Sequence, residues 1–139
     1  MFLYVDGSVA DGEAGWGVVV IVETNWPSCQ FVHCGWFGGS VCTEASDMAF
    51  IGAASKTNAS AEMSAVAWAI AWVLQTRCTA KVVITGDNEN AGGVAEGSKI
   101  STAEPTLGSV LHVLFLCARV RTELSWDHVP AHCGQPWNE

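Results

Sequence analysis

The sequence predicts a mixed α/β domain, in which a sheet is flanked by helices. The 139 residues correspond to one domain, residues 1–139, and half of them are hydrophobic, which is enough to bury a core without disulfide bonds. The hydrophobic pattern predicts three strands, a helix, a strand, a short helix, a second long helix and a last strand. Strands that first follow one another and then alternate with helices are typical of a mixed sheet covered by helices.

The first forty residues predict three strands. Residues 2–9 form a short apolar run that is expected to end near its Asp-Gly-Ser sequence, and the turn signal ADGEAG follows it. The β-branched run 16–23 is strand-like, and residues 29–39 could be its hairpin partner. The stretch 40–56 is too polar and too rich in glycine for an assignment.

The remainder of the chain alternates between helices and strands. Residues 57–77 predict the clearest helix, because they are rich in alanine and begin with side chains that can cap a helix. The continuous apolar run at 80–88 is typical of a central strand that ends in polar residues. A short, glycine-weakened helix is expected at 89–97, and a longer one at 104–121 has a proline in its first turn. Residues 123–132 predict the last strand.

Composition and charge exclude several classes of protein. The formal net charge is -8, and the six Lys and Arg residues are scattered, which argues against a protein that holds nucleic acid by charge alone. Neither a signal peptide nor a run long enough to span a membrane is present, so we expect an intracellular protein that is not secreted and has no membrane partner. The six cysteines include no CxxC pair, and we expect reduced, mostly buried thiols.

A zinc site is the alternative role for some of these cysteines. The candidate ligands are Cys29, His33, Cys34 and Cys42. Their spacing fits none of the common zinc-ligand patterns, so the sequence favours the reduced thiols.

Three acidic residues stand where metal-dependent chemistry is common. Asp6 lies near the carboxyl end of the first strand, Asp87 ends the strand at 80–88, and Glu62 lies in the first turns of the long helix. If the two strands are parallel neighbours, their carboxyl ends meet at one sheet edge, and a helix packed across that edge would add Glu62. Each acid alone could instead serve an Asx turn, a helix dipole or a helix cap. Together they would repel one another, and a divalent cation such as Mg²⁺ would remove that repulsion.

Four motifs in this order resemble the type 1 ribonuclease H family, most closely the domains carried in retrotransposon polyproteins. "LYVDGS" followed by "GWGVVV" resembles the family's first hairpin with its Asp, and "TNASAEMSAVAWAI" resembles its Thr-Asn-Asn-x-x-Glu helix start. "VITGDNENAGGV" is similar to its strand that ends in Asp, and "HVPAHCGQPWNE" to its closing His-x-Gly-x-Pro-x-Asn-Glu. The motifs span nearly the whole chain. The resemblance implies a five-stranded mixed sheet, antiparallel over its first three strands and then parallel, flanked by helices.

The resemblance also implies an activity and a metal site. The family hydrolyses the RNA strand of RNA/DNA hybrids, and Asp6, Glu62 and Asp87 would match its catalytic metal ligands. Two Mg²⁺ ions about 4 Å apart, or Mn²⁺ as a substitute, would activate water and stabilise the leaving oxygen. His132 would match the loop His that acts as a proton shuttle or aids product release.

The implied partners are nucleic acid and a polymerase. By the resemblance, Gly7, Ser8, Asn58 and Asn88 are candidates for contacts to the hybrid, where 2′-hydroxyl groups distinguish RNA from DNA. A covalently linked reverse transcriptase in the parent polyprotein would supply most of the grip on the hybrid. We expect the chain itself to be a monomer.

The chain departs from the family pattern at three places. The family's fourth carboxylate would lie three residues past Glu139, so most of the last helix is expected to be missing and the activity of this chain impaired. Ala59 replaces the family's second Asn. Only the segment "GSKISTA", with Lys99, stands where some members insert a basic helix and loop, so we expect weak binding by the chain alone.

Three alternatives to an active ribonuclease H follow from these departures. The chain could be a catalytically inactive fragment of the same fold, retained as a structural or nucleic-acid-interacting domain. An exonuclease or integrase-like relative could carry the same three acids, but the closing His-Gly-Pro-Asn-Glu pattern argues against it. A flavodoxin-like binding domain would need a phosphate-cradling loop, and the sequence has neither a P-loop nor a GxGxxG after a strand.

Overall fold

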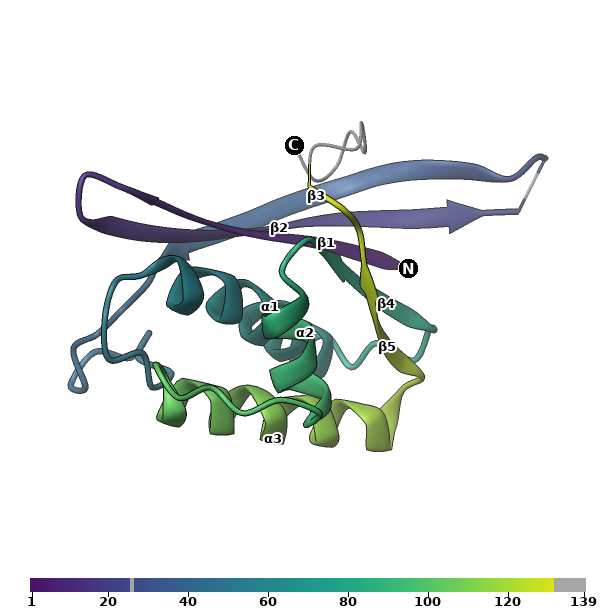
Figure 1. Ribbon diagram of the computed structural model, residues 1–139. Helices are drawn as coiled ribbons and strands as arrows, with labels where there is room; N and C mark the ends of the chain where they lie inside the picture. Colours follow the sequence, from purple (N-terminus) through teal and green to yellow (C-terminus); the bar gives the residue numbers. More distant parts are fainter. Residues whose placement is uncertain (26, 132–139) are drawn as a thin grey trace.

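A computed structural model describes residues 1–25 and 27–131 of the chain and shows one mixed sheet with three helices on one of its faces (Figure 1). The strand order is β3-β2-β1-β4-β5. The predicted architecture is therefore confirmed: a five-stranded mixed sheet whose first three strands are antiparallel and whose remaining pairings are parallel. The elements are β1 (Phe2–Ala10), β2 (Glu13–Thr24), β3 (Gln30–Ser40), α1 (Asn58–Gln75), β4 (Val82–Gly86), α2 (Glu89–Glu96), α3 (Pro105–Arg121) and β5 (Leu124–His128).

The sheet changes direction between its two halves. β1 and β3 are both antiparallel to β2, whereas β4 runs parallel to β1 and β5 runs parallel to β4. The parallel pairing of β1 with β4 aligns Tyr4 with Thr85. The same register, carried two residues further, sets Asp6 beside Asp87 at the edge where the parallel pairing stops.

β1 is longer than the sequence predicted. The strand was expected to end near the Asp6-Gly7-Ser8 sequence, but it continues to Ala10 because its second half pairs with β2. The hairpin closes through Asp11 and Gly12, which have φ angles of 51° and 78°. Two consecutive left-handed residues are typical of the two-residue turns that match the twist of a β-hairpin. Asp6 therefore lies within a strand and not at its end.

The start of α1 is set by local hydrogen bonds. The side chain of Thr57 accepts a hydrogen bond from the backbone N–H of Ser60, and the Ser60 hydroxyl accepts one from the backbone N–H of Thr57. This reciprocal capping box satisfies two donors that a helix start leaves free. The predicted helix is confirmed, and its regular part is shorter than 57–77 by one residue at its start and two at its end.

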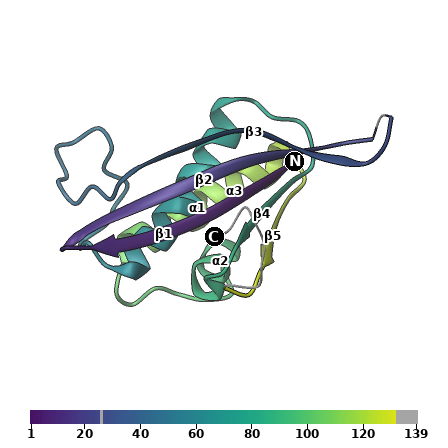
Figure 2. The same ribbon diagram turned by 90° about the horizontal axis from the view of Figure 1, so that it is seen from above.

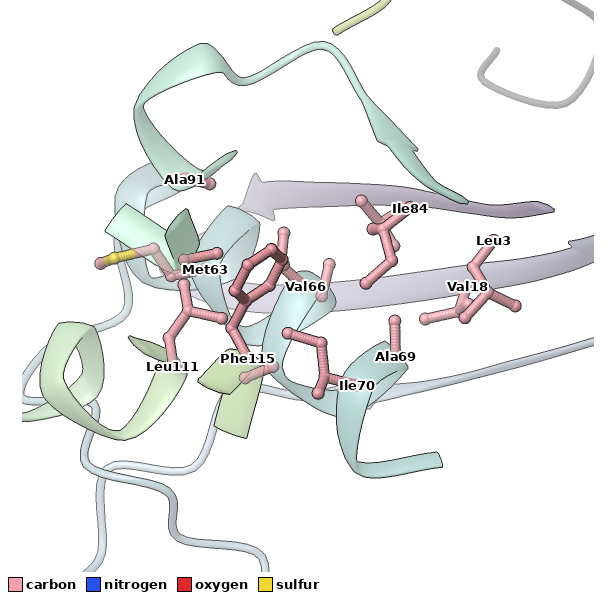
Figure 3. Packing of buried hydrophobic residues seen from close by; sticks show 14 of the residues in the cluster. Leu3, Val18, Met63, Val66, Ala69, Ile70, Ile84, Ala91, Leu111 and Phe115 are labelled. Carbon is pink, nitrogen blue, oxygen red and sulfur yellow. The ribbon is translucent and has the colours of Figure 1, made fainter. Parts of the chain in front are cut away.

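α1 is buried on two sides. Its aliphatic residues pack between the sheet and α3, where Val66 and Ile70 meet Leu3, Val18, Ile84 and Phe115 (Figure 3). Its two tryptophans stack on rings of the sheet: Trp68 on Trp16 at 5.4 Å, and Trp72 on Phe37 at 5.8 Å between centroids. The helix therefore has a fixed position relative to β1, which matters for Glu62.

The unassigned stretch 40–56 contains no helix beyond the end of β3 and is held in place by a buried carboxylate. Glu104, the residue before α3, is fully buried. Its carboxylate accepts hydrogen bonds from the backbone N–H of Ala54 at 2.6 Å, and from the backbone N–H and hydroxyl of Ser55 at 3.1 and 2.6 Å. These bonds join residues about fifty positions apart and fix the segment that leads into α1.

The expectation of mostly buried thiols is wrong for the described cysteines. Cys29, Cys34 and Cys117 are exposed, while Cys42 and Cys78 are half-buried, and all five are free. The exposure arises because β3 is a sheet edge and Cys117 lies on the outer face of α3. Among the residues that the structure describes, no cysteine or histidine belongs to a cluster able to hold a metal, so the zinc alternative gains no support.

The long β2–β3 hairpin extends past the helices, as the view from above shows (Figure 2). No described helix has both the length and the apolar character that crossing a bilayer requires.

Candidate active site

Three carboxylates from three elements converge at the edge of the parallel part of the sheet. They are Asp6 of β1, Glu62 of α1 and Asp87, which directly follows β4. One ligand oxygen from each lies within 4.8 Å of the other two. Asp6 is exposed, Asp87 is half-buried and Glu62 is buried. The convergence predicted from the sequence is therefore found in the structure.

Gly7 makes this convergence possible. A Cβ atom at this position would lie 2.4 Å from the backbone nitrogen of Glu62 and 2.5 Å from the carbonyl carbon of Ala61. Because both neighbours are backbone atoms, neither could move aside without shifting the helix. Glycine lets the first turns of α1 lie directly on β1, which brings Glu62 to the side of Asp6.

The electrostatics of the cluster are unfavourable without a cation. Burial first, and then the charges of Asp6 and Asp87, raise the pKa of the Glu62 carboxyl to about 8, against a hydrogen bond from the Gly7 backbone that lowers it. The pKa of Asp6 is also raised, first by desolvation and then by the charge of Asp87. The described Lys residues that form ion pairs bind Glu13 and Glu123, so no described cation offsets the cluster.

The donor set fits hard divalent cations. Three carboxylates within reach of one point offer the oxygen ligands that Mg²⁺ and Mn²⁺ prefer, with room left for water and substrate oxygens. A cation bound there would lower the pKa of Glu62 and remove the mutual repulsion of the acids. The arrangement is that of a candidate metal site at the carboxyl edge of a sheet.

Asn58 and Asn88, two of the predicted substrate-binding residues, line one hollow beside the carboxylates. The hollow has a volume of about 350 Å³ and is also lined by Lys99, Ser101 and Thr102. The side-chain oxygen of Asn88 caps α2 by accepting a hydrogen bond from the Ala91 backbone at 2.9 Å. Asn88 therefore has a structural role at its oxygen, while Asn58 is exposed at the start of α1.

The remaining predicted residues are placed as follows. Ser8 is exposed on β1, beyond Asp6, while Gly7 is partly covered by α1. His132 lies outside the described residues, as does Glu139. His128 ends β5, and its Nε2 lies 3.1 Å from the backbone oxygen of Asp87. It thus joins β5 to the segment that carries Asp87.

Segment 99–103 forms one wall of the hollow but was not among the predicted site residues. Lys99 was predicted only as an isolated basic residue, yet its ammonium group donates a hydrogen bond to the Asn90 side chain at 2.9 Å, close to Asn88. The available signal was the short connection between α2 and α3, because a short loop must stay close to the eight-residue helix that it follows.

Solved structures of RNase H1 proteins share this fold. LC11-RNase H1, solved in complex with an RNA/DNA hybrid and isolated from compost by a metagenomic approach, aligns over 94% of this chain and 85% of its own, with 18% identity and a TM-score of 0.62. RNase H1 from the archaeon Halobacterium salinarum aligns over 94% and 85%, with 17% identity and a TM-score of 0.56. A foamy viral protease-reverse transcriptase, solved with double-stranded DNA, aligns over 96% and 83%, with 16% identity and a TM-score of 0.62.

Neither a protein-family model nor a curated protein sequence matches the chain. At identities of 16 to 18%, the structural likeness establishes the ribonuclease H-like fold. The chemistry must be argued from the site.

Proposed function

We propose that this chain is a ribonuclease H-type endonuclease that hydrolyses the RNA strand of RNA/DNA hybrids. The observation that carries the proposal is the convergence of Asp6, Glu62 and Asp87 within 4.8 Å on a sheet of the ribonuclease H-like type. A cluster of acids with raised pKa values needs a cation to become fully ionised, and nucleic-acid hydrolysis is chemistry that such cations support.

In this proposal Asp6, Glu62 and Asp87 hold two Mg²⁺ ions, with Mn²⁺ as a substitute. Bound cations of this kind activate water, neutralise charge on the phosphate and stabilise the leaving oxygen. Glu62 must give up its proton when the site is loaded, because its pKa of about 8 leaves it largely protonated at neutral pH without a cation. His132 is proposed to move a proton or to aid release of the product.

The hollow beside the carboxylates is proposed to contact the hybrid. Asn58 and Asn88 line it together, and their amide groups can donate to or accept from the 2′-hydroxyl groups that distinguish RNA from DNA. The backbone of Gly7 and the exposed Ser8 complete the proposed contact surface. Among the residues that the structure describes, Lys99 is the sole cation that lines this hollow, so neutralisation of phosphates is limited and binding by the chain alone is weak.

The weak binding suggests a larger parent protein. We propose a retrotransposon-type polyprotein, in which a linked reverse transcriptase supplies most of the affinity for the hybrid. The occurrence of the same fold in a foamy viral protease-reverse transcriptase supports this setting. Such a substrate implies an intracellular location, and the isolated chain is proposed to be a monomer.

A second candidate function is a catalytically inactive domain of the same fold that acts only through binding or structure. The net charge of -8 and Ala59 in place of the family's second Asn favour it. It differs from the first candidate in one measurable property, namely cleavage that depends on the carboxylates.

Cleavage of a labelled RNA/DNA hybrid with Mg²⁺ or Mn²⁺ tests the proposal. The proteins to compare are the chain, a version extended past Glu139 by a helix with Asp at the third added position, and Asp87→Asn in each. Glu96→Gln is the matched control, because Glu96 is exposed at the end of α2 and lies outside the carboxylate cluster. We expect cleavage that Asp87→Asn abolishes and Glu96→Gln leaves unchanged.

The pattern of activity separates the two candidates. If only the extended version cleaves the hybrid, the proposed site is supported and the unextended chain is an impaired fragment. Absence of cleavage from both versions, with circular dichroism spectra of folded protein, would contradict the proposal and favour the inactive domain.

A further inference from the structure

A second hollow lies at the end of the molecule opposite the carboxylates. α1 and α3 both end near the starts of β4 and β5 (Figure 1). Residues at the two helix ends line the hollow. Its volume is about 440 Å³, within the range of small-molecule sites. Arg77 follows α1 and lies fifteen residues beyond Glu62, which corresponds to about 22 Å along a helix. A ligand in this hollow would therefore be independent of the reaction centre.

The hollow, termed here the arginine hollow, is lined by Arg77 and Arg121 above an apolar floor. Val73 and Leu74 of α1 and Ala118 of α3 supply the floor. Val73 and Ala118 belong to the buried core, so the floor is rigid. Both arginine side chains are exposed at the rim.

These two arginines differ from the other cations of the chain. Four of the six Lys and Arg residues have a partner: Lys56 with Glu13 at 2.6 Å, Lys81 with Glu123 at 3.1 Å, Lys99 with Asn90 at 2.9 Å, and Arg119 over the ring of Phe115 at 5.8 Å. Within the described part of the chain, the guanidinium groups of Arg77 and Arg121 have no such partner. Two unpaired guanidinium groups at one hollow leave their donors available to an anion.

Arg77 holds its place at a conformational cost. Its φ angle is 51°, in the left-handed region where glycine usually terminates a helix. The backbone N–H of the next residue, Cys78, bonds the carbonyl oxygen of Val73 at 3.3 Å, so this turn closes the helix. A residue with a side chain at this point is less favourable than glycine, which suggests that the Arg77 side chain has a role of its own.

We propose that the arginine hollow binds a small organic anion, in which a carboxylate or phosphate ester is attached to a compact apolar group. Guanidinium groups present paired donors that match the oxygens of such anions. The apolar group would lie against Val73, Leu74 and Ala118, and the oxyanion would lie between Arg77 and Arg121. The arginine hollow would then be a ligand site separate from the proposed nuclease site.

Binding of two probes to the full chain tests this proposal. Hexanoate represents the carboxylate source and phenyl phosphate the phosphate ester, with neutral hexanamide and phenol as matched controls. Dissociation constants come from backbone chemical shifts in NMR titrations. We expect at least one anion to bind with shifts centred on the arginine hollow, and its neutral counterpart to bind at least 10-fold more weakly. Tighter binding of hexanoate identifies the carboxylate source, and tighter binding of phenyl phosphate identifies the ester.

Three variants distinguish a ligand site from a structural role. Arg121→Gln should weaken binding at least 10-fold, whereas Arg119→Gln, on the same helix but over Phe115, should not change it. Arg77→Gly should raise the melting temperature, because glycine favours the left-handed conformation, and should still weaken binding. Equal binding of anions and neutral controls, no binding of either anion, or equal weakening by Arg119→Gln and Arg121→Gln would overturn the proposal.

Discussion

Glu62 and Glu104 are both buried glutamates near the start of a helix, yet their surroundings differ. Glu104 accepts three hydrogen bonds, from the backbone N–H groups of Ala54 and Ser55 and from the Ser55 hydroxyl. Glu62 instead lies beside two further carboxylates, and its pKa rises to about 8. Burial alone therefore does not identify a functional acid. A buried carboxylate with its own donors stabilises the fold, whereas one that faces like charges is suited to a cation.

The largest difference between the two glutamates is expected in the rate at which their variants cleave an RNA/DNA hybrid. Glu62→Gln is expected to reduce cleavage of an RNA/DNA hybrid by at least about 10²-fold, because it removes a proposed metal ligand. Glu104→Gln keeps one of the two acceptor oxygens and replaces the other by an amide nitrogen, which lowers stability. Because it leaves the three carboxylates of the site in place, the folded variant should retain cleavage within a few-fold. Initial rates at saturating Mg²⁺ measure the difference. If both variants are folded and lose cleavage activity equally, the cluster of Asp6, Glu62 and Asp87 has no special role in the reaction.

The free energy of unfolding, in contrast, should depend more strongly on Glu104 than on Glu62. Glu104→Ala removes a fully buried carboxylate and the acceptor of the hydrogen bonds from Ala54 and Ser55, which should cost about 3 kcal/mol in the free energy of unfolding. Urea denaturation monitored by circular dichroism measures it. Glu96→Ala, at an exposed position, is the control and should change the free energy by less than about 0.5 kcal/mol. A loss as small as the control's would contradict the anchoring role of Glu104.

The pH dependence of stability should reveal Glu62 directly. Its folded-state pKa of about 8 exceeds the reference value of 4.5, so the folded state binds the proton more tightly than the unfolded state. The stabilisation is therefore complete below pH 4.5 and is lost as the pH rises through about 8.

Urea denaturation without divalent cations should show this decline in the wild-type chain and not in Glu62→Gln. Mg²⁺ should restore stability at high pH, because it binds the ionised form. Identical pH profiles for the two proteins would contradict the raised pKa.

The two asparagines of the active-site hollow should show the smallest difference. Asn88→Ala removes the cap of α2 and should lower the free energy of unfolding by about 1 kcal/mol. Asn58→Ala, at an exposed position, should leave stability unchanged. If both residues contact the hybrid, both variants should raise KM for cleavage. Unchanged KM in both would remove them from the proposed contact surface.

Much of the fold followed from patterns within short segments. The alanine-rich composition and the residues around Thr57 predicted α1, and the apolar run before Asp87 predicted β4. The acids of the candidate site were also predicted, because the parallel pairing of β1 with β4 brings their carboxyl ends together. Helix capping and hydrophobic periodicity involve residues that are close together in the chain, so both can be recognised from the sequence.

Features that depend on distant residues were not predicted. The continuation of β1 to Ala10 depends on its pairing with β2, and the position of the stretch 40–56 depends on Glu104, about fifty residues away. The cysteines were expected inside because of their apolar neighbours, but Cys117 lies on the outer face of α3. Which face of an element is covered depends on the packing of the whole domain.

The sequence by itself determined which side chains could form the site: Asp6, Glu62 and Asp87, with Asn58 and Asn88 nearby. Only the tertiary structure decided how these groups interact. The contact of Gly7 with the backbone of Glu62 sets the separation of the carboxylates, and their burial and mutual repulsion set their pKa values. Likewise, Arg77 and Arg121 line one hollow, although they lie at the ends of two helices that are far apart in the chain. Electrostatic and desolvation energies depend on distances through space, and folding alone determines those distances.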